Sequence, residues 1–515
     1  MLEPFRNEPL SDFADPARAA AYRDALAQVR RRLGGHWPMI IGGRKIGTEK
    51  KIVSLNPARP AEVVGTVAAA TSSHVDPALD AAWRAFPDWA GLRPEARVAA
   101  ILKLAVELRR HKYELAAWET LEAGKNWLEA EADVCEAIDF CDYYARGALE
   151  LAHPLPLHPY PGEINESRLQ PLGAGVVIPP WNFPLAILVG MTIGPAAAGN
   201  TVVLKPSSYT PVVAARFMEL VAAAGLPDGV INFLPGRGSE VGDYLVDHVR
   251  TRFVNFTGSK EVGLQIAERA AKVHPGQVWL KRAALEMGGK DAIIVDETAD
   301  LDEAVAAVLP SAFGYSGQKC SGASRLIILA EVYDEMLKRL AAAAANLQIG
   351  PAEENFAVGP VISESQHQAI LGDIEQGRSQ ARLVLGGKAV DLDGGYYLEP
   401  TVFAEAPPES RLAQHEIFGP VLAVMRVRDF DEAVQVFNRT IYGLTGGLMS
   451  RSRERIERAK RELYVGNLYI NRKITGALVG VQPFGGFKLS GTNAKAGGPD
   501  YLRLFLEMKT VAERL

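Results

Sequence analysis

The 515-residue sequence has only three cysteines, Cys135, Cys141 and Cys320. Three cysteines cannot build the disulfide framework of a small secreted domain, so we expect a reducing compartment, the cytoplasm. A net charge of -5 leaves no basic excess for binding nucleic acid. The nine histidines show no HExxH spacing, so the sequence predicts no bound metal. These scarcities argue against a disulfide-rich secreted domain, a nucleic-acid-binding protein and a metalloenzyme.

Long apolar segments are also scarce. The first residues, MLEPFRNEPLSDF, contain no apolar run of the length of a signal peptide. Residues 169–204 lack charge and are long enough to cross a bilayer, but five prolines interrupt them. The prolines divide this segment into a β-branched run, a loop, an apolar helix and a second strand. We therefore expect the buried core of a parallel sheet and no membrane span.

What is present is an alternation of strands and helices. Short strands ending in Pro, Gly or small polar residues recur from 175 to 257, and a second set begins near residue 291. Helical periodicity dominates the first third, for example over residues 96–121. This rhythm predicts two α/β domains with parallel sheets, and ligands bind such sheets at the carboxyl ends of the strands.

Two glycine-rich turns are candidate phosphate sites. GRGSEVG (236–242) has one residue too many for the dinucleotide fingerprint, whereas FTGSKEVG (256–263) offers backbone N–H groups at a strand-to-helix turn. Glycine-rich turns of this kind are also common for steric reasons alone. Nucleotide binding therefore stays an open alternative at this point.

Cys320 lies in YSGQKCSGASR, a loop of small residues with Lys319 before it and Arg325 after it. A structural cysteine usually has apolar neighbours, while cationic neighbours favour the thiolate. We therefore expect a nucleophilic cysteine with a lowered pKa. Lys319 and Arg325 are the candidates for the positive field.

Two further polar residues have two interpretations each. Glu286, in ALEMGGK, is either an exposed turn glutamate or a general base whose pKa is raised by burial. Asn182, in PPWNFP, either caps a helix starting near Pro184 or donates its amide N–H to a developing oxyanion. A cysteine nucleophile, an amide donor, a carboxylate base and a nucleotide site together fit covalent oxidation of an aldehyde.

The order and spacing of seven motifs resemble the aldehyde dehydrogenase superfamily over nearly the whole chain. They are PWNFP, KPSS, FTGSKEVG, EMGGK, GQKCSGASR, EIFGPV and PFGGFKLSG. The resemblance implies an α/β fold with a Rossmann-type cofactor domain, a second α/β catalytic domain and a small β oligomerisation flap. The implied limits are 1–144 and 165–286 for the NAD-binding domain, 287–481 for the catalytic domain, and 145–164 with 482–515 for the flap. A homodimer or hexamer is the implied assembly.

The resemblance also implies a role for each site residue. Cys320 would attack the aldehyde, Asn182 would bind the oxyanion, and Glu286 would activate the water that hydrolyses the thioester. The implied cofactor-binding residues are Ile178, Pro180, Trp181, Lys205, Ser207, Ser208, Gly258, Ser259, Val262, Gly288, Glu416 and Phe418. The implied substrate-binding residues are Phe183, Lys319, Ser321, Gly476, Ala477 and Phe484.

A narrower resemblance concerns EPFRNEP, YPGEINES, NRKITGALVGVQPFGG and the C-terminal segment. These stretches are similar to a branch of the superfamily that oxidises L-glutamate γ-semialdehyde to glutamate, the second step of proline breakdown. A separate proline dehydrogenase is then a conceivable partner. The alternatives are a dehydrogenase of another semialdehyde or a general aliphatic aldehyde, and a non-catalytic structural or binding protein on the same fold.

The sequence departs from the family pattern after Lys205. The usual Lys-Pro-x-Glu reads Lys-Pro-Ser-Ser here, so Ser208 replaces the glutamate that repels the 2′-phosphate of NADP. We therefore expect NAD as the preferred cofactor and NADP as an accepted one. Met287 replaces the usual leucine after the base, and we expect this change to be harmless.

Overall fold

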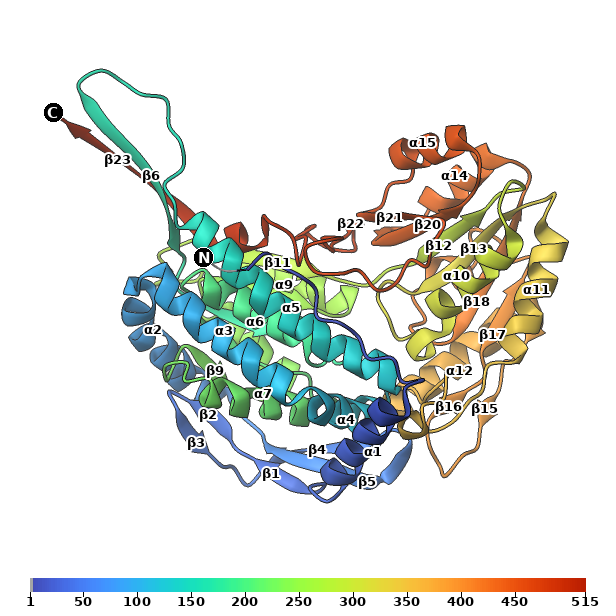
Figure 1. Cartoon of the computed structure of the whole chain (residues 1–515), viewed down its shortest axis with the longest axis horizontal. Coiled ribbons are helices and arrows are strands. Elements are labelled where there is room, and N and C mark those ends of the chain that lie inside the picture. The colour runs from blue at the N-terminus through green and yellow to red at the C-terminus, as the bar shows by residue number, and fades with distance from the viewer. Residues whose placement is uncertain (1–2) are drawn as a thin grey trace.

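The computed structural model describes residues 3–515. They form two lobes, each built around a seven-stranded sheet, and a two-stranded ribbon projects from the first lobe (Figure 1). A three-stranded sheet packs at the outside of the first lobe, and its strands are β1 (Gly35–Trp37), β4 (Lys51–Asn56) and β5 (Arg59–Ala68). The lobes match the two sets of strands that the sequence predicts.

The first large sheet has the strand order β11-β10-β7-β8-β9-β2-β3. The chain proceeds from β7 through β8 to β9 on one side and returns to add β10 and β11 on the other side, all in parallel. Strand order therefore reverses between β7 and β10, and ligands bind at such points, outside the carboxyl ends of the strands. The bounds are β7 Ala174–Ile178, β8 Thr201–Leu204, β9 Ile231–Phe233, β10 Phe253–Thr257, β11 Arg282–Glu286, β2 Met39–Ile41 and β3 Arg44–Ile46.

The uncharged segment 169–204 forms the centre of this sheet, as predicted. It contains β7, helix α6 (Ala186–Ala197) and β8, and every residue of both strands is buried. Val176 packs in the apolar cluster of helix α2 (Val75–Gly91), whereas Val177 packs in the cluster of α6. Alternate residues thus enter different cores, because successive strand side chains point to opposite faces. In the part of the chain that is described, no helix is long and apolar enough to span a membrane.

The second large sheet has the order β14-β17-β18-β13-β12-β20-β21. All neighbours are parallel except the edge strand β14, and strand order reverses between β12 and β20. The bounds are β12 Asp291–Val295, β13 Ala323–Leu329, β14 Arg382–Leu385, β17 Thr401–Ala404, β18 Val421–Val427, β20 Thr445–Met449 and β21 Asn467–Ile470.

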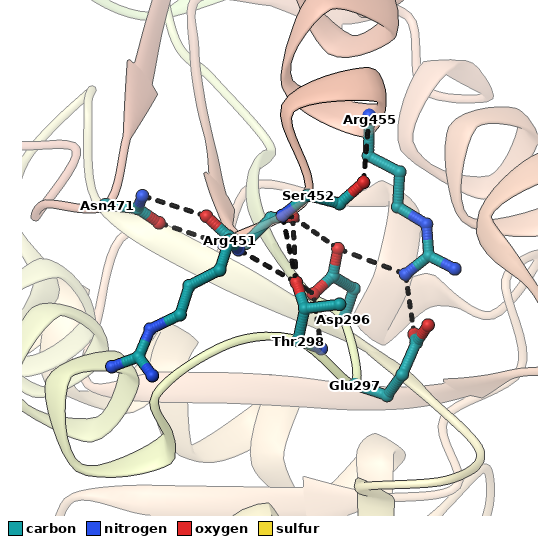
Figure 2. Close-up of polar contacts among 8 residues, drawn as sticks. Asp296, Glu297, Thr298, Arg451, Ser452, Arg455 and Asn471 are labelled. Carbon is teal, nitrogen blue, oxygen red and sulfur yellow. Dashed lines mark hydrogen bonds and ion pairs between the residues drawn. The ribbon is translucent and has the colours of Figure 1, made fainter.

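Polar side chains join the carboxyl ends of β12, β20 and β21 (Figure 2). Asp296 accepts hydrogen bonds from the Ser450 hydroxyl at 2.5 Å and pairs with Arg455 at 3.1 Å. The Asn471 side chain accepts from the Ser450 N–H at 2.9 Å. The hydrogen-bonding groups here are therefore paired with one another, at the point where a doubly wound sheet often binds a ligand.

Helices cover the faces of both sheets. The first third is helical over α3 and α4, as predicted, but the strands β1 to β5 between residues 35 and 68 were not expected from its composition. The remaining main helices are α1 Pro16–Arg30, α3 Pro94–Arg110, α4 Lys112–Ala123, α5 Trp127–Leu151, α7 Pro211–Ala223, α8 Asp243–Asp247, α9 Lys260–Ala271, α10 Leu301–Phe313, α11 Tyr333–Ala345, α12 Glu364–Arg378, α13 Arg411–Gln414, α14 Phe430–Asn438 and α15 Arg453–Glu462.

The projecting ribbon consists of β6 (Glu163–Pro171) and β23 (Leu506–Arg514), paired antiparallel along their full length (Figure 1). The predicted oligomerisation flap of 145–164 and 482–515 overlaps this ribbon only at 163–164 and 506–514, and its role in assembly stays a prediction. Helix α5 continues through Leu151, and the segment before the ribbon bonds to β11, since Thr492 N–H donates to Leu285 at 2.8 Å. The sequence did not show these limits because the Ala-rich helix has no stop signal before residue 151.

Candidate active site

A buried cavity of about 80 Å³ lies between elements of the two lobes. Its walls come from α5, α6, the ends of β10 and β11, the loop around Cys320, and the segments 476–484 and 494–496. Cys320 and Glu286 both line it, although Glu286 ends β11 of the first sheet and Cys320 lies in the loop before β13 of the second sheet. The cavity is therefore the place where a thiol, a carboxylate and a small molecule can meet.

The loop that carries Cys320 is held in an unusual backbone conformation. Tyr315 and Ser316 have φ angles of 52° and 54°, a left-handed region that costs energy for residues other than glycine. The Tyr315 hydroxyl donates to the Ala123 carbonyl at 2.8 Å, and the Ser316 hydroxyl donates to the Gly359 carbonyl at 2.6 Å. Surrounding elements thus fix the turn that delivers Cys320 to the cavity.

The predicted positive field around Cys320 is wrong. Lys319 pairs with Glu129 at 2.6 Å, and Arg325 donates to the carbonyls of Lys290, Val436 and Phe437. Burial raises the pKa of the Cys320 thiol well above its ordinary value, and the carboxylates of Glu286, Asp291 and Glu416 raise it further. The sequence shows which cations lie nearby in the chain but not which carbonyls and carboxylates they meet. The resting cysteine is accordingly a thiol, and a base must remove its proton.

Glu286 ends strand β11 and is 9% exposed, so its interpretation as an exposed turn residue is wrong. Among the described residues its Oε1 atom has no hydrogen-bond partner. Burial raises the pKa of Glu286 to about 8, and Lys495 opposes this shift. A carboxyl group with a pKa near neutrality can both take and return a proton at working pH.

Asn182 does not cap a helix. Helix α6 begins only at Ala186 with Leu185 at its N-cap position, while the Asn182 side chain is 4% exposed. Its Nδ2 atom donates to the carbonyl of Gln318 at 3.0 Å, two residues before Cys320. An amide nitrogen has two N–H donors, so this bond fixes the amide beside the nucleophile and leaves one N–H for another acceptor.

Five of the six predicted substrate residues line the cavity: Phe183, Ser321, Gly476, Ala477 and Phe484. Gly476 has a φ of 74°, a conformation that glycine adopts without strain. Lys319 is the exception, because its ammonium group is paired with Glu129 and it is not among the lining residues. Binding of the substrate by Lys319 therefore has no support from the cavity walls and stays a prediction.

A second carboxylate, Glu136 of α5, also lines the cavity and was missed from the sequence. Burial, and to a smaller extent the charge of Asp133, raise the pKa of Glu136 to about 8, while the charge of Lys125 opposes this shift. In the sequence Glu136 stands in the helical stretch EADVCEAIDF, where a glutamate is indistinguishable from a solvent-exposed helix residue. Only the packing of α5 against α6 shows that it faces the cavity.

The predicted cofactor residues cluster outside the cavity, at the carboxyl ends of the first sheet. Ile178 ends β7, and Pro180 and Trp181 follow it; Lys205, Ser207 and Ser208 follow β8; Gly258 and Ser259 follow β10; and Gly288 follows β11. Ser259 caps α9, with the Val262 N–H 3.4 Å from its hydroxyl, so the helix N-terminus is open to an anionic group. This is the reversal point of strand order noted above.

Glu416 and Phe418 reach the same place from the second lobe. Trp181 packs edge-on to Phe418 with ring centroids 5.5 Å apart, and Glu416 accepts a hydrogen bond from Gly289 N–H at 2.9 Å. A Cβ atom at Gly288 would displace the Glu416 carboxylate from this position. Burial raises the pKa of Glu416 to about 7. The two lobes therefore meet at the predicted cofactor site.

Lys205 supplies a test of whether a dinucleotide suits this site. Lys205 is 6% exposed, and its ammonium group donates to the carbonyls of Pro206 at 3.1 Å and Gly236 at 3.3 Å. Burial lowers its pKa to about 8, and among residues 3–515 its hydrogen-bond partners are carbonyls and not carboxylates. A buried cation that lacks an anionic partner fits a ligand rich in hydroxyl and phosphate oxygens. Within the same residues no cluster of three or more His, Cys, Asp or Glu could hold a metal ion.

With the fold and this geometry established, comparison with known proteins defines the class. Residues 45–511 match the model of the aldehyde dehydrogenase family, and the chain belongs to this family. The sequence is 52% identical to the 1-pyrroline-5-carboxylate dehydrogenase of Geobacillus kaustophilus (strain HTA426), and the match covers 100% of both chains. It is 50% identical to 1-pyrroline-5-carboxylate dehydrogenase 2 of Bacillus subtilis (strain 168), again over 100% of both.

Solved structures agree with these relatives. A 1-pyrroline-5-carboxylate dehydrogenase from Thermus with bound NAD superposes with a TM-score of 0.99 at 58% identity, and 100% of each chain is covered. Proline utilization A from Bdellovibrio bacteriovorus gives a TM-score of 0.97 at 47% identity; the match covers 99% of this chain and 53% of that one. This chain therefore resembles about half of that larger protein.

Proposed function

We propose that this chain oxidises L-glutamate γ-semialdehyde, the open form of 1-pyrroline-5-carboxylate, to L-glutamate with NAD as the hydride acceptor. The observation that carries the proposal is a single cavity lined by Cys320, Glu286 and the Gly476–Ala477 turn. Full-length relatives named 1-pyrroline-5-carboxylate dehydrogenase support the choice of substrate. This reaction would be the second step of proline degradation.

The Cys320 side chain performs the covalent step. Because its pKa is raised, its proton must pass to a base as the sulfur attacks the aldehyde carbon. The candidate bases are the two carboxylates that line the cavity with a pKa near neutrality, Glu136 and Glu286. The carbonyl oxygen becomes an oxyanion, which the Asn182 amide and the Cys320 backbone N–H stabilise. Bound NAD supplies the acceptor for the hydride that leaves the carbon. The thioester on Cys320 is then hydrolysed by water that Glu286 deprotonates.

The far end of the substrate carries an α-carboxylate and an α-ammonium group. We assign the carboxylate to the backbone N–H groups of Gly476 and Ala477 and to the Ser321 hydroxyl, all at the cavity wall. Phe183 and Phe484 enclose the aliphatic part of the chain. Neutral N–H and O–H donors orient such a carboxylate through directional hydrogen bonds. Unlike a lysine or arginine, they leave no unpaired buried cation when the substrate is absent.

The cofactor would be held by the residues at the lobe junction. Ser207 and Ser259 are assigned to the pyrophosphate, Lys205 and Ser208 to the adenosine ribose, and Glu416 to the nicotinamide ribose. Ile178, Pro180, Trp181, Val262 and Phe418 provide apolar walls, while Gly258 and Gly288 allow close approach. A Thermus relative described with bound NAD supports NAD as the cofactor.

A panel of aldehydes tests the proposed substrate. With NAD and absorbance detection, we expect kcat/KM for glutamate γ-semialdehyde to exceed that for succinate semialdehyde and for propanal. Equal values would assign the chain to general aliphatic aldehydes, and a preference for succinate semialdehyde would reassign the substrate. No NADH formation with any aldehyde would leave only a non-catalytic role.

The replacement Asn182→Ala removes the proposed oxyanion donor. We expect a loss of about 3 kcal/mol of transition-state stabilisation, roughly a hundredfold in kcat, because preorganised donors act where charge develops. The substrate KM should change little. A decrease in kcat below tenfold would show that the amide mainly holds the Gln318 carbonyl in place.

The replacement Ser208→Glu tests cofactor choice. Ser208 is exposed in the loop that follows β8, two residues beyond Pro206. One unit charge at about 4 Å is worth roughly 4 kcal/mol at an effective dielectric of 20, and even a third of this is about tenfold in affinity. We expect wild type to prefer NAD and to accept NADP, and the variant to discriminate about tenfold more strongly. An unchanged ratio of kcat/KM for NAD over NADP would remove Ser208 from the ribose site.

We infer that the chain assembles as a homodimer or hexamer through the β6–β23 ribbon. An isolated two-stranded ribbon is marginally stable in water, so a partner surface is expected to cover it. A separate proline dehydrogenase is the inferred supplier of substrate, because proline utilization A extends well beyond the part that this chain matches.

A further inference from the structure

Three charged side chains are fully buried beside the cavity and have no part in the chemistry above. Lys125 lies between α4 and α5; its Nζ atom pairs with Asp133 of α5 and lies 3.5 Å from Oε2 of Glu119 in α4. All three side chains have 0% or 1% exposure. Asp133 also accepts the Ala186 N–H at 2.5 Å, so the cluster is bonded to the start of α6.

The Lys125 ammonium group also lies over two aromatic rings. Its Nζ atom is 4.4 Å from the ring centroid of Phe183 and 5.3 Å from that of Tyr315. Phe183 lines the cavity, and Tyr315 begins the left-handed turn that leads to Cys320. A cation within about 6 Å of a ring face is attracted by the ring quadrupole, most strongly where water is excluded. One buried charge therefore contacts both the substrate wall and the nucleophile loop.

Stability alone is a poor explanation for this cluster. A buried ion pair is often no more stabilising than apolar residues of the same volume, since desolvation opposes the Coulomb attraction. Both carboxyl oxygens of Glu119 also lack a hydrogen-bond partner among residues 3–515. Burial raises the pKa of Glu119 well above its ordinary value, and the carboxylate of Asp133 lies closer to the Lys125 ammonium group than that of Glu119 does. Such a costly arrangement calls for a role in positioning.

We propose that Lys125 is a positioning residue that fixes Phe183 and Tyr315 against each other, and thereby sets the distance between the wall of the cavity and Cys320. Asp133 and Glu119 hold the ammonium group in place, and Asp133 anchors it to α6. The inference rests on the proposed function only in taking this cavity as the aldehyde site. It adds a residue that acts on the substrate through Phe183 without touching it.

Fluorinated phenylalanines at position 183 test the proposal without disturbing the buried charges. Fluorine withdraws electron density from the ring face and weakens its attraction for a cation. From 4-fluoro- to 3,4,5-trifluorophenylalanine, we expect kcat/KM for the semialdehyde to fall in steps, to about a tenth of wild type, mainly through KM. 4-Methylphenylalanine controls for bulk and should not follow the series. A flat response to fluorine would overturn the proposal.

A double-mutant cycle approaches the same contact from the lysine. Lys125→Met combined with Asp133→Asn removes the cation together with its ion-pair partner, so the net charge of the cluster does not change. We expect about a tenfold loss in kcat/KM in the wild-type background and a clearly smaller loss in Phe183→Leu, because only the Tyr315 contact then remains to transmit the effect. NAD affinity measured by calorimetry should be unchanged. Equal losses in both backgrounds would show that Lys125 acts on folding alone.

Lys112→Met is the matched control. Lys112 also pairs with a buried carboxylate, Glu131 at 2.9 Å, and lies 5.8 Å from the Tyr113 ring. Unlike Phe183, the Tyr113 ring does not line the cavity. Its kcat/KM should equal that of wild type. If the lysine variant does not fold, the fluorine series decides. If wild type oxidises only another aldehyde, the proposed substrate fails, and the same measurements with that aldehyde still test Lys125.

Discussion

Replacing Cys320 with serine abolishes NADH formation and leaves NAD binding nearly intact. The expected loss in kcat is at least about 10⁴-fold, which is within the range for removal of a nucleophile that acts with a base. The hydroxyl of serine is a much poorer nucleophile than a thiol at neutral pH. Turnover is read from NADH absorbance and NAD affinity from calorimetry.

Cys135→Ser is the control for this prediction. Cys135 is also a buried free cysteine, but it lies in α5, and its thiol is 3.8 Å from the Pro9 carbonyl. Burial raises its pKa to about 12, so it remains a thiol. This variant should retain turnover, apart from a modest loss of stability. Substantial activity in Cys320→Ser would refute covalent catalysis by this residue.

The sequence predicted the fold well where one physical signal dominates. The uncharged segment 169–204 could be assigned to β7, α6 and β8 because prolines and β-branched residues mark their limits. The strands β1 to β5 were missed, since each is short or half-exposed and lacks a regular apolar alternation. Element type is thus readable from long buried runs and much less so at exposed edges.

For the site, too, the positions of residues in the chain were predictable, whereas their contacts in space were not. The positions of Cys320, Glu286 and Asn182 were identified from motifs, and five of six proposed substrate residues do line the cavity. The electrostatics were not predictable: Lys319 and Arg325 lie close to Cys320 in sequence, but their charges are directed to Glu129 and to backbone carbonyls. Glu136 and Lys125 could not be recognised, because burial depends on contacts between α4, α5 and α6.

The raised pKa of Cys320 sharpens the question of what Glu286 does. A thiol in this cavity needs a base before it attacks, and a thioester needs a base before water attacks. Glu286 lines the same cavity and has no hydrogen-bond partner at Oε1 among the described residues. The two roles make different predictions for the variant Glu286→Gln, which keeps the size of the side chain and removes its basicity.

If Glu286 serves mainly in hydrolysis, Glu286→Gln still forms the thioester once, and turnover then stalls. Rapid mixing with NAD and semialdehyde should show a burst of about one NADH per site, followed by a steady rate at least about a hundredfold below wild type. Loss of the burst together with the steady rate would instead assign Glu286 to activation of the thiol. Glu136→Gln, at the other cavity carboxylate, should show no stall after the first turnover. A stall in this variant would assign the role of hydrolytic base to Glu136 in place of Glu286.

The pH dependence of the wild-type steady state provides an independent check. The pKa of Glu286 is raised to about 8, so at pH 7 most of the population is protonated and cannot act as a base. Hydrolysis should therefore accelerate as pH rises through about 8 and level off above it, while the burst of Glu286→Gln should lack this titration. If the steady rate of wild type were already constant from pH 6 to 9, the hydrolytic base would have to be a group with a lower pKa than Glu286 has in this cavity.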